Sequence, residues 1–262
     1  LKEENLMKII VCIKQVPDTE TRIKLIAGSN RIDTKDVKFI INPYDEFALE
    51  EGLRVKEKLG GDVTVITVGS SDVEQSVREC FARGVENGIR IWGDGFENIE
   101  PLGTAKVLAK VISNMPYDLI ICGKHAIDDD SAQVGILLAD FLKIPHVPVV
   151  IKAEIYEKEA KLQRQIEGGI EVVGVTLPAL FTAQKGLNEP RYPSLKGKMA
   201  AKKKSIQFID GNTLGVDIKP RMHIIDMNLP KARVAGTILK DVEPAEAAVK
   251  LVKFLREEAN II

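Results

Sequence analysis

The sequence is short of cysteine and lacks any long apolar run, and both shortages narrow the class of protein. Its 262 residues include three cysteines, Cys12, Cys80 and Cys122, and no CxxC pair. Disulfide scaffolds and cysteine-held metal centres are therefore disfavoured, and we expect reduced thiols in a reducing compartment. No run approaches the roughly 18–20 apolar residues of a membrane span, and no signal peptide is visible. The sequence thus predicts a cytoplasmic location without membrane insertion.

Catalytic motifs and excess charge are equally scarce. The chain has 37 Lys and Arg against 38 Asp and Glu, so its net charge of −1 gives no general attraction to nucleic acid or to a membrane surface. It contains no GxGxxG, GxxxxGK[ST] or GxSxG motif, which excludes the usual dinucleotide fingerprint, the P-loop and the hydrolase nucleophile elbow. The three histidines, His125, His146 and His223, form no pair with metal-ligand spacing. We expect no metal site and no stand-alone catalytic group.

What the sequence does contain is an alternation of apolar strands and amphipathic helices. This alternation predicts an α/β fold with a doubly wound, mostly parallel sheet of the adenine-nucleotide-binding type. Ligands of such sheets bind beyond the carboxyl ends of the strands, at the topological switch point. The loops after Lys14, Ile41, Val68 and Cys122 are therefore expected to converge there. The strand patterns cover residues 8–14, 62–68, 89–92, 119–122 and 147–151.

Capping residues mark the expected helix boundaries. Asn42 is a good N-cap, Pro43 suits the first helical position, and Gly60 stands where the helix should end. The segment from Ser71 to Glu74 has the form of a capping box, which predicts that the next helix starts at Ser71. Residues 101–114 carry an apolar stripe at helical spacing, as do residues 244–258.

The alternation stops after residue 152. Residues 153–165 and 170–176 predict an antiparallel hairpin, and residues 180–183 predict one more strand. Residues 184–204 are irregular and rich in lysine. A solvated or protein-docking loop explains this cluster better than a nucleic-acid site, because aromatic residues are almost absent from it.

A loop at residues 123–135 is the main candidate site. It joins an expected strand end to a helix start, which Ser131 is expected to cap, and free N–H groups there favour an anion such as phosphate. Asp128, Asp129 and Asp130 could hold Mg²⁺ beside a phosphate, but a solvated acidic turn is the favoured interpretation. His125 is interpreted as a packing residue rather than a base.

Several separated motifs resemble the β subunit of electron-transfer flavoproteins. The resemblance covers nearly the whole chain from about Met7, and Phe181 departs from an aliphatic preference. The matching segments are residues 164–171 (RQIEGGIE) with Val173, Pro178, Leu180 and Thr182, residues 187–192 (LNEPRY), the lysine run 202–204, Lys14, Asn42-Pro43, Gly123-Lys124 and residues 126–130 (AIDDD).

The resemblance implies a non-catalytic electron carrier that forms a heterodimer with an α subunit. The two subunits share a redox-active FAD, and the β subunit binds a second nucleotide, which is AMP in ordinary carriers and FAD in electron-bifurcating ones. Ser131, Gln133 and the N–H groups of residues 132–135 are the expected phosphate contacts. By residue match, the cofactor-binding residues are Cys12, Asn42, Pro43, Tyr44, Asp45, Val68, Gly123, Lys124, His125, Ala126, Ile127, Asp128, Asp129, Asp130, Ser131, Ala132, Gln133 and Val134.

The motifs at residues 15–19, 44–45 and 131–135 resemble bifurcating members, although Asp129 stands where those often have glycine. The resemblance therefore favours a second FAD that takes a hydride from NADH, with structural AMP as the alternative. Arg191 and Leu195 are implied to dock a flavin dehydrogenase or a quinone-linked oxidoreductase. Two rival functions are an adenine-nucleotide enzyme, whose HxGH or SGGxDS motif is missing, and a structural partner with an empty pocket.

These expectations divide the chain in two. Residues 7–220 should form the α/β nucleotide-binding domain, including the hairpin and the docking loop. Residues 221–262 should form a C-terminal extension whose terminal helix contacts the α subunit.

Overall fold

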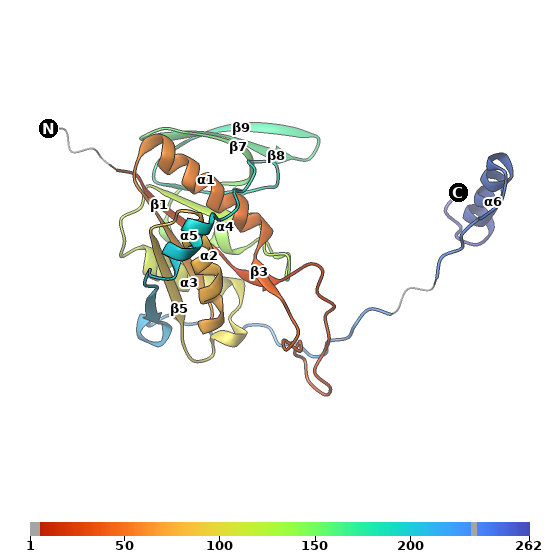
Figure 1. The fold of residues 1–262 in the computed structure, drawn as a ribbon, viewed down its shortest axis with the longest axis horizontal. Helices are drawn as coiled ribbons and strands as arrows, with labels where there is room; N and C mark the ends of the chain where they lie inside the picture. The colour runs from red at the N-terminus through yellow and green to blue at the C-terminus, as the bar shows by residue number, and fades with distance from the viewer. Residues whose placement is uncertain (1–5, 232–234) are drawn as a thin grey trace. The chain divides into compact units, whose positions relative to one another are not determined.

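A computed structural model describes residues 6–231 and 235–262 (Figure 1). They divide into two compact units, Leu1–Ile225 and Asp226–Ile262. The domain boundary expected after residue 220 stays a prediction, because compactness alone does not show which part folds independently.

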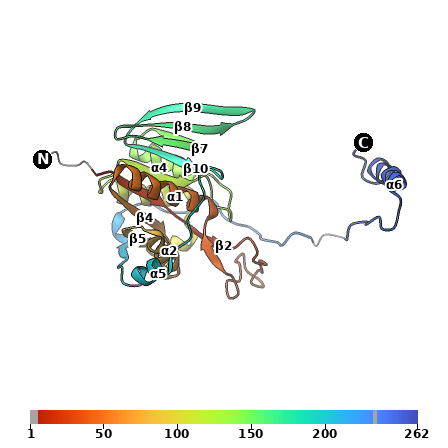
Figure 2. The same ribbon diagram turned by 45° about the horizontal axis from the view of Figure 1, so that its top comes forward.

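The first unit is built on a nine-stranded sheet in the order β11-β5-β4-β1-β6-β10-β7-β8-β9. The strands from β11 to β7 pair in parallel, whereas β8 and β9 are antiparallel additions at one edge, seen at the top of Figure 2. The expected α/β fold is therefore confirmed. The sheet's strands are β1 Lys8–Cys12, β4 Asp62–Val68, β5 Asn87–Trp92, β6 Leu119–Gly123, β7 His146–Ile155, β8 Glu159–Ile166, β9 Gly169–Thr176, β10 Ala179–Ala183 and β11 Gln207–Asp210.

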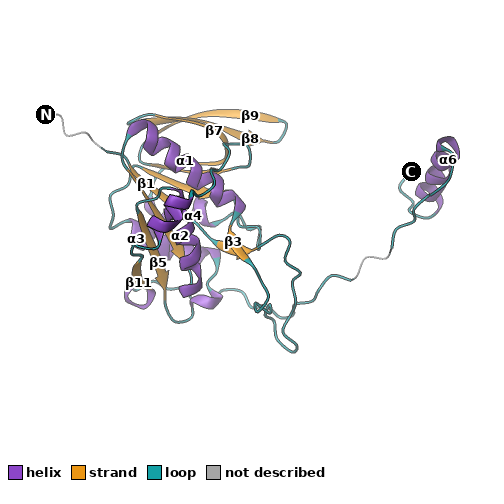
Figure 3. Ribbon diagram, in the orientation of Figure 1, coloured by secondary structure: helices purple, strands orange, loops and turns teal. Residues whose placement is uncertain are grey.

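Helices cover both faces of the sheet (Figures 1 and 3). Side chains alternate between the faces of a strand, so neighbouring residues of β1 enter different cores. Ile9 and Val11 pack with α1 and α2, whereas Ile10 packs with α3 and α4. The helices are α1 Pro43–Leu59, α2 Glu74–Arg83, α3 Pro101–Ile112, α4 Val134–Leu142, α5 Leu195–Ala201 and α6 Pro244–Glu257, with short 3-10 turns at Ser71–Val73, Phe96–Asn98 and Gly211–Leu214.

Two expected helix starts are wrong. The capping box does not form, because Ser71–Val73 is a 3-10 turn and α2 begins at Glu74. Ser131 does not cap the helix that follows it, since α4 begins at Val134 with Gln133 in the N-cap position.

The irregular segments also contain structure that the pattern did not indicate. The range 153–165, expected as one strand of a hairpin, is divided between β7 and β8, so the chain makes two successive hairpins. Residues 15–17, expected as a loop, form β2 (Gln15–Pro17), which pairs with β3 (Phe39–Ile41) in a separate two-stranded sheet. A short helix, α5, lies within the lysine-rich segment.

The position of β1 fixes where the chain reverses direction across the sheet. From β1 the chain adds β4 and β5 on one side, and then β6 on the other side of β1. The crevice between β1 and β6 is thus the switch point at which ligands of open parallel sheets bind. Cys12 and Cys122 face one another there as paired positions at the ends of the two strands.

The second unit holds α6. Within this unit no residue of α6 is buried, although the helix carries an apolar stripe that includes Val249, Leu251 and Val252. Among the described helices, none is long and apolar enough to cross a membrane.

Candidate functional site

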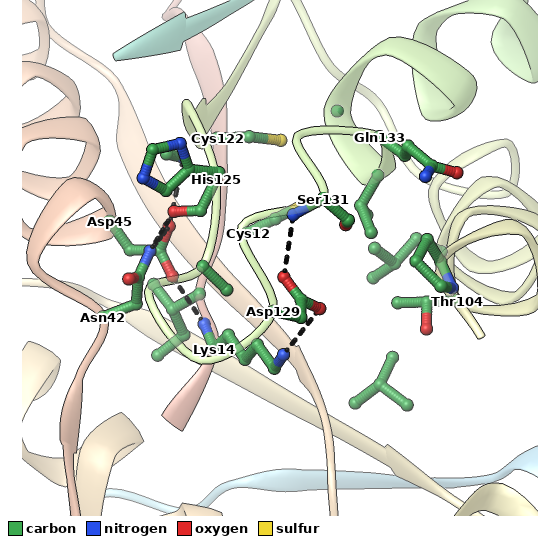
Figure 4. A pocket seen from close by; sticks show the side chains of 18 of the residues that line it. Cys12, Lys14, Asn42, Asp45, Thr104, Cys122, His125, Asp129, Ser131 and Gln133 are labelled. Atoms are coloured by element: carbon green, nitrogen blue, oxygen red, sulfur yellow. Dashed lines mark hydrogen bonds and ion pairs between the residues drawn. The ribbon is translucent and has the colours of Figure 1, made fainter. Parts of the chain in front are cut away.

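A cavity of about 180 Å³ opens at the switch point (Figure 4). A single water needs roughly 10–15 Å³ on this measure, so the cavity accommodates a much larger ligand. Its lining comes from the carboxyl ends of β1, β4 and β6, the starts of α1, α3 and α4, and the loop at residues 123–135.

Asp45 is the centre of the hydrogen bonding on one side of the cavity. Its carboxylate accepts the N–H of Lys14 at 2.7 Å, the N–H of Gly123 at 3.1 Å and the Asn42 amide at 3.0 Å. Burial raises the pKa of Asp45 from 3.8 to about 7, although the three donors and the Lys14 charge favour the ionised form. One carboxylate therefore ties the ends of β1 and β6 to the start of α1.

Asn42 attaches the start of α1 to the loop. It occupies the N-cap position, yet its side chain makes no capping bond. Instead its amide donates to the carbonyl of His125 at 2.8 Å and its oxygen accepts the N–H of Ile127 at 3.2 Å. The rings of Tyr44 and His125 meet edge to face at 4.2 Å. Asn42 and Tyr44 thus shape the loop rather than only start a helix.

The acidic triplet is partly paired with neighbouring side chains. Lys14 Nζ lies 2.8 Å from Asp128 and 3.2 Å from Asp129, and His125 Nδ1 lies 3.0 Å from Asp130. Asp129 also accepts the N–H of Ser131 at 3.2 Å, so it holds the turn that leads to α4 (Figure 4). Within the described ranges 6–231 and 235–262, no group of three or more His, Cys, Asp or Glu side chains is placed to hold a metal ion.

Two glycines allow the backbone to pack closely at the cavity. A Cβ on Gly123 would lie 2.2 Å from Asp45 Oδ1 and 2.8 Å from the backbone of Tyr44. A Cβ on Gly135 would lie 2.9 Å from the methyl of Thr182. Larger residues at either position would therefore displace the walls of the cavity.

The starts of three helices line this region. The first-turn amides of a helix have no partner within it, and the dipole adds a partial positive charge. Residues lining the cavity include Val134 and Gly135 at the start of α4 and Pro101 and Thr104 at the start of α3. In Figure 4, Thr104 and Gln133 lie opposite Asn42, Asp45 and His125. The electrostatics favour an anionic group such as a phosphate.

Of the two thiols at the switch point, that of Cys122 is poorly suited to chemistry. A hydrogen bond with Cys12 and burial together raise the pKa of the Cys122 thiol well above its ordinary value. A thiol held protonated is a weak nucleophile and a weak metal ligand. Cys122 thus contributes to the shape of the cavity that it lines.

The structure brings most of the expected cofactor residues together. The expected residues that line the cavity are Cys12, Asn42, Asp45, Val68, Gly123, Lys124, His125, Ala126, Asp129, Ser131, Ala132, Gln133 and Val134. Those that do not are Pro43, Tyr44, Ile127, Asp128 and Asp130.

Sequence reasoning missed the wall formed by α3. Ile99, Pro101, Thr104 and Leu108 line the cavity, although none was expected there. The available signal was that Pro101 starts the next α-helix after the strand ending at Trp92, which places it on the ligand edge of a parallel sheet.

The two expected docking residues lie away from the cavity. Leu195 begins α5 and its side chain is 78% exposed. Arg191 instead turns its guanidinium onto Glu50 and Glu57 of α1.

The fold and the cavity define a class: doubly wound α/β proteins with an anion-favouring cavity at the switch point of the sheet. A family model described as "Electron transfer flavoprotein domain" matches residues 30–212. The chain is 40% identical to "Electron transfer flavoprotein subunit beta" of Bacillus subtilis (strain 168), over 260 residues that cover 98% of this chain and 100% of the relative. The protein of the same name from Thermoanaerobacterium thermosaccharolyticum is 43% identical over 88% of this chain and 92% of its own, and that from Homo sapiens is 35% identical over 93% and 97%. The chain belongs to the electron transfer flavoprotein β-subunit family.

Proposed function

We propose that the chain is the β subunit of a heterodimeric electron carrier and that its cavity binds the adenosine 5′-phosphate group of a nucleotide. The observation that supports this most is the convergence of three helix starts and the close-packed Gly123 and Gly135 on one cavity at the switch point. The Lys14 ammonium pairs with Asp128 and Asp129, which lowers the electrostatic repulsion between the acidic triplet and a phosphate.

The phosphate contacts in this proposal come from the start of α4. Ser131 offers a hydroxyl, Gln133 offers an amide, and residues 132–135 offer backbone N–H groups. Asp129 supports these contacts because it holds the N–H of Ser131. The apolar side chains of Ile66, Val68 and Leu108 suit the less polar part of the ligand.

The sequence resemblance favours FAD over AMP as the ligand that carries this group. A bound FAD would supply hydride acceptance from NADH and one-electron transfer, while the residues of this chain hold it and exclude water. With AMP, the cavity has a structural role, and the FAD shared with the α subunit carries the electrons alone.

Two surfaces complete the proposal. The apolar stripe of α6, which nothing in its own unit covers, contacts the α subunit, since an amphipathic helix needs a surface on which to pack. The segment around Leu195 docks a flavin dehydrogenase or a quinone-linked oxidoreductase. The cytoplasmic location also stays a prediction.

The decisive experiment counts the nucleotides released from the purified heterodimer. Two FAD per heterodimer support bifurcation, one FAD with one AMP supports the ordinary carrier, and a cavity that retains no adenine nucleotide refutes the proposed site. Ser131→Ala with Gln133→Ala should lower the content of the β-subunit nucleotide. Ser113→Ala is the control, because the Ser113 hydroxyl donates to the carbonyl of Lys110 at the end of α3 and does not line the cavity. ATP turnover by the isolated chain would instead favour an adenine-nucleotide enzyme.

A further inference from the structure

The docking segment, defined here as residues 188–204, is fastened to the α/β unit at both ends. This inference rests on the docking role proposed above and concerns what holds the segment in place. Its first attachment is to α1, where Glu50, Glu51 and Glu57 face the chain.

The strongest attachment is a multiple ion pair at Arg191. Its Nε donates to Glu50 Oε2 at 2.8 Å, and its Nη2 donates to Glu50 Oε1 at 3.1 Å and to Glu57 Oε2 at 3.0 Å. The Arg191 N–H also donates to Glu50 Oε2 at 3.1 Å. The Glu50 side chain is only 4% exposed. A forked guanidinium fits this arrangement, whereas an ammonium group does not.

Asn188 adds a second contact to the same helix. Its amide donates to the carbonyl of Phe47 at 3.0 Å and to Glu51 Oε2 at 2.9 Å. Burial raises the pKa of Glu51, while pairing with Arg191 lowers the pKa of Glu57. The acidic side chains of α1 thus bind two residues of the segment, Arg191 and Asn188.

The far end of the segment is held by α2. The Ser194 hydroxyl caps α5 by accepting the N–H of Gly197 at 3.0 Å. Gly197 packs so closely that a Cβ there would lie 2.1 Å from the carbonyl of Ala82. Arg78 donates to the carbonyls of Ala201 and Lys204 at 3.2 Å. Both ends of α5 are thus attached to α2.

Between these attachments the segment presents apolar side chains to solvent. Tyr192 is 93% exposed, Leu195 78% and Met199 66%, and Leu195 and Met199 lie one helical turn apart. Ordering such side chains at the moment of docking costs free energy, and a preformed geometry lowers that cost.

We propose that Arg191 is a positioning residue: it acts through Glu50 and Glu57 to hold Leu195 and its neighbours in the geometry that docks the partner, and it does not contact the partner itself. Four donor groups of Arg191, including its backbone N–H, are already engaged by the two glutamates. If Arg191 acted on the partner as a free positive charge, these donor groups would be available to the partner.

The test uses the complete heterodimer and a flavin dehydrogenase chosen because it reduces the unmodified heterodimer. Arg191→Lys keeps the charge and loses the fork, whereas Glu50→Gln keeps the shape and loses the acceptor charge. Each should raise the KM for the heterodimer about tenfold with kcat unchanged, because each removes charged hydrogen bonds from the fastening. The double variant should raise the KM little more than either single variant does, since both changes break the same network. Arg164→Lys, which alters an ion pair on the exposed β8–β9 hairpin, is the matched control.

A second measurement does not depend on the partner. Amide hydrogen exchange across residues 188–201 should accelerate in both variants and not in Leu195→Ala or Arg164→Lys. Unchanged exchange would overturn the proposal. So would a raised KM for Arg191→Lys with an unchanged KM for Glu50→Gln, because that pattern indicates direct contact with the partner. If Leu195→Ala leaves KM unchanged, the docking assignment fails, and hydrogen exchange alone then decides the positioning role.

Discussion

Helices α3 and α6 have similar sequence patterns and different surroundings. Each has a proline in its first turn and an apolar stripe at helical spacing. Leu108 and Ile112 of α3 are almost completely buried against the sheet, whereas Leu251 of α6 is 52% exposed. Apolar periodicity thus indicates that a helix needs a partner surface but not whether its own chain supplies it. The α/β unit builds its core and its cavity from its own residues, whereas α6 has no buried residue within its own unit.

The most direct test of this comparison is to truncate a leucine on each helix. Leu108→Ala should lower the free energy of unfolding of the isolated chain by about 3 kcal/mol, because it removes the contacts of an almost completely buried side chain and enlarges the cavity that it lines. Leu251→Ala should change it by less than about 0.5 kcal/mol, since its side chain is exposed. Denaturant unfolding of both variants measures this. A loss of similar size for Leu251→Ala would show that α6 packs on its own chain.

The second prediction asks whether the cavity wall is as closely packed as the core. Gly123→Ala should destabilise the chain by about 3 kcal/mol, because the added methyl meets Asp45 and the Tyr44 backbone. It should also weaken AMP binding, measured by calorimetry. Gly174→Ala, in open space on β9, is the control and should leave AMP binding unchanged. Unchanged affinity in Gly123→Ala would mean that the Gly123 turn does not form the nucleotide site.

The third prediction uses the titration of Asp45. Its folded-state pKa lies above its unfolded value of 3.8, so between these two values the folded protein binds more protons than the unfolded chain. The stability from this group is therefore greatest at low pH and is lost as the pH rises through about 7. Between about pH 5.5 and pH 8, wild-type protein should lose about 2 kcal/mol relative to Asp45→Asn, which cannot titrate. Parallel pH profiles would contradict a buried, titrating Asp45.

The smallest effect is expected at Asp129. Asp129→Ala removes a partly exposed ion pair with Lys14, which is worth less than about 1 kcal/mol in unfolding experiments. Because Asp129 also holds the N–H of Ser131, nucleotide retention should fall more than stability does. Asp140→Ala removes another exposed pair, with Lys143, and serves as the control. Equal effects of both changes on nucleotide retention would remove Asp129 from the site.

Sequence signals predicted the elements whose causes are local. Asn42, Pro43 and Gly60 bound α1 as expected, and the apolar runs of β1, β4 and β6 gave a parallel sheet whose strand-end loops meet at one cavity. The Ser71 segment misled because a local capping pattern also fits a 3-10 turn. The strands β2 and β11 were missed because they are short and their pairing partners are far away in sequence.

Side-chain partners were the least predictable part of the site. Nothing in the sequence around Asp45 shows that its carboxylate meets Gly123, which lies 78 positions further along the chain. In the same way, the resemblance indicated that Arg191 belongs to a docking loop but not that Glu50 would engage it. Such contacts depend on how helices pack on the sheet, which local propensity does not specify.

The insertion of β10 between β6 and β7 has a consequence for how the protein is made. Because β7 precedes β10 in the chain but lies beyond it in the sheet, the two hairpins β7–β8 and β8–β9 must be synthesised before the sheet can close. Thr182, against which Gly135 packs, is in β10, so the cavity wall is finished only when that strand has left the ribosome. Until then β6 has an open edge, on the side that β10 later pairs with, that can pair wrongly or aggregate. We expect nascent chains that end before residue 179 to need protection and to bind no nucleotide.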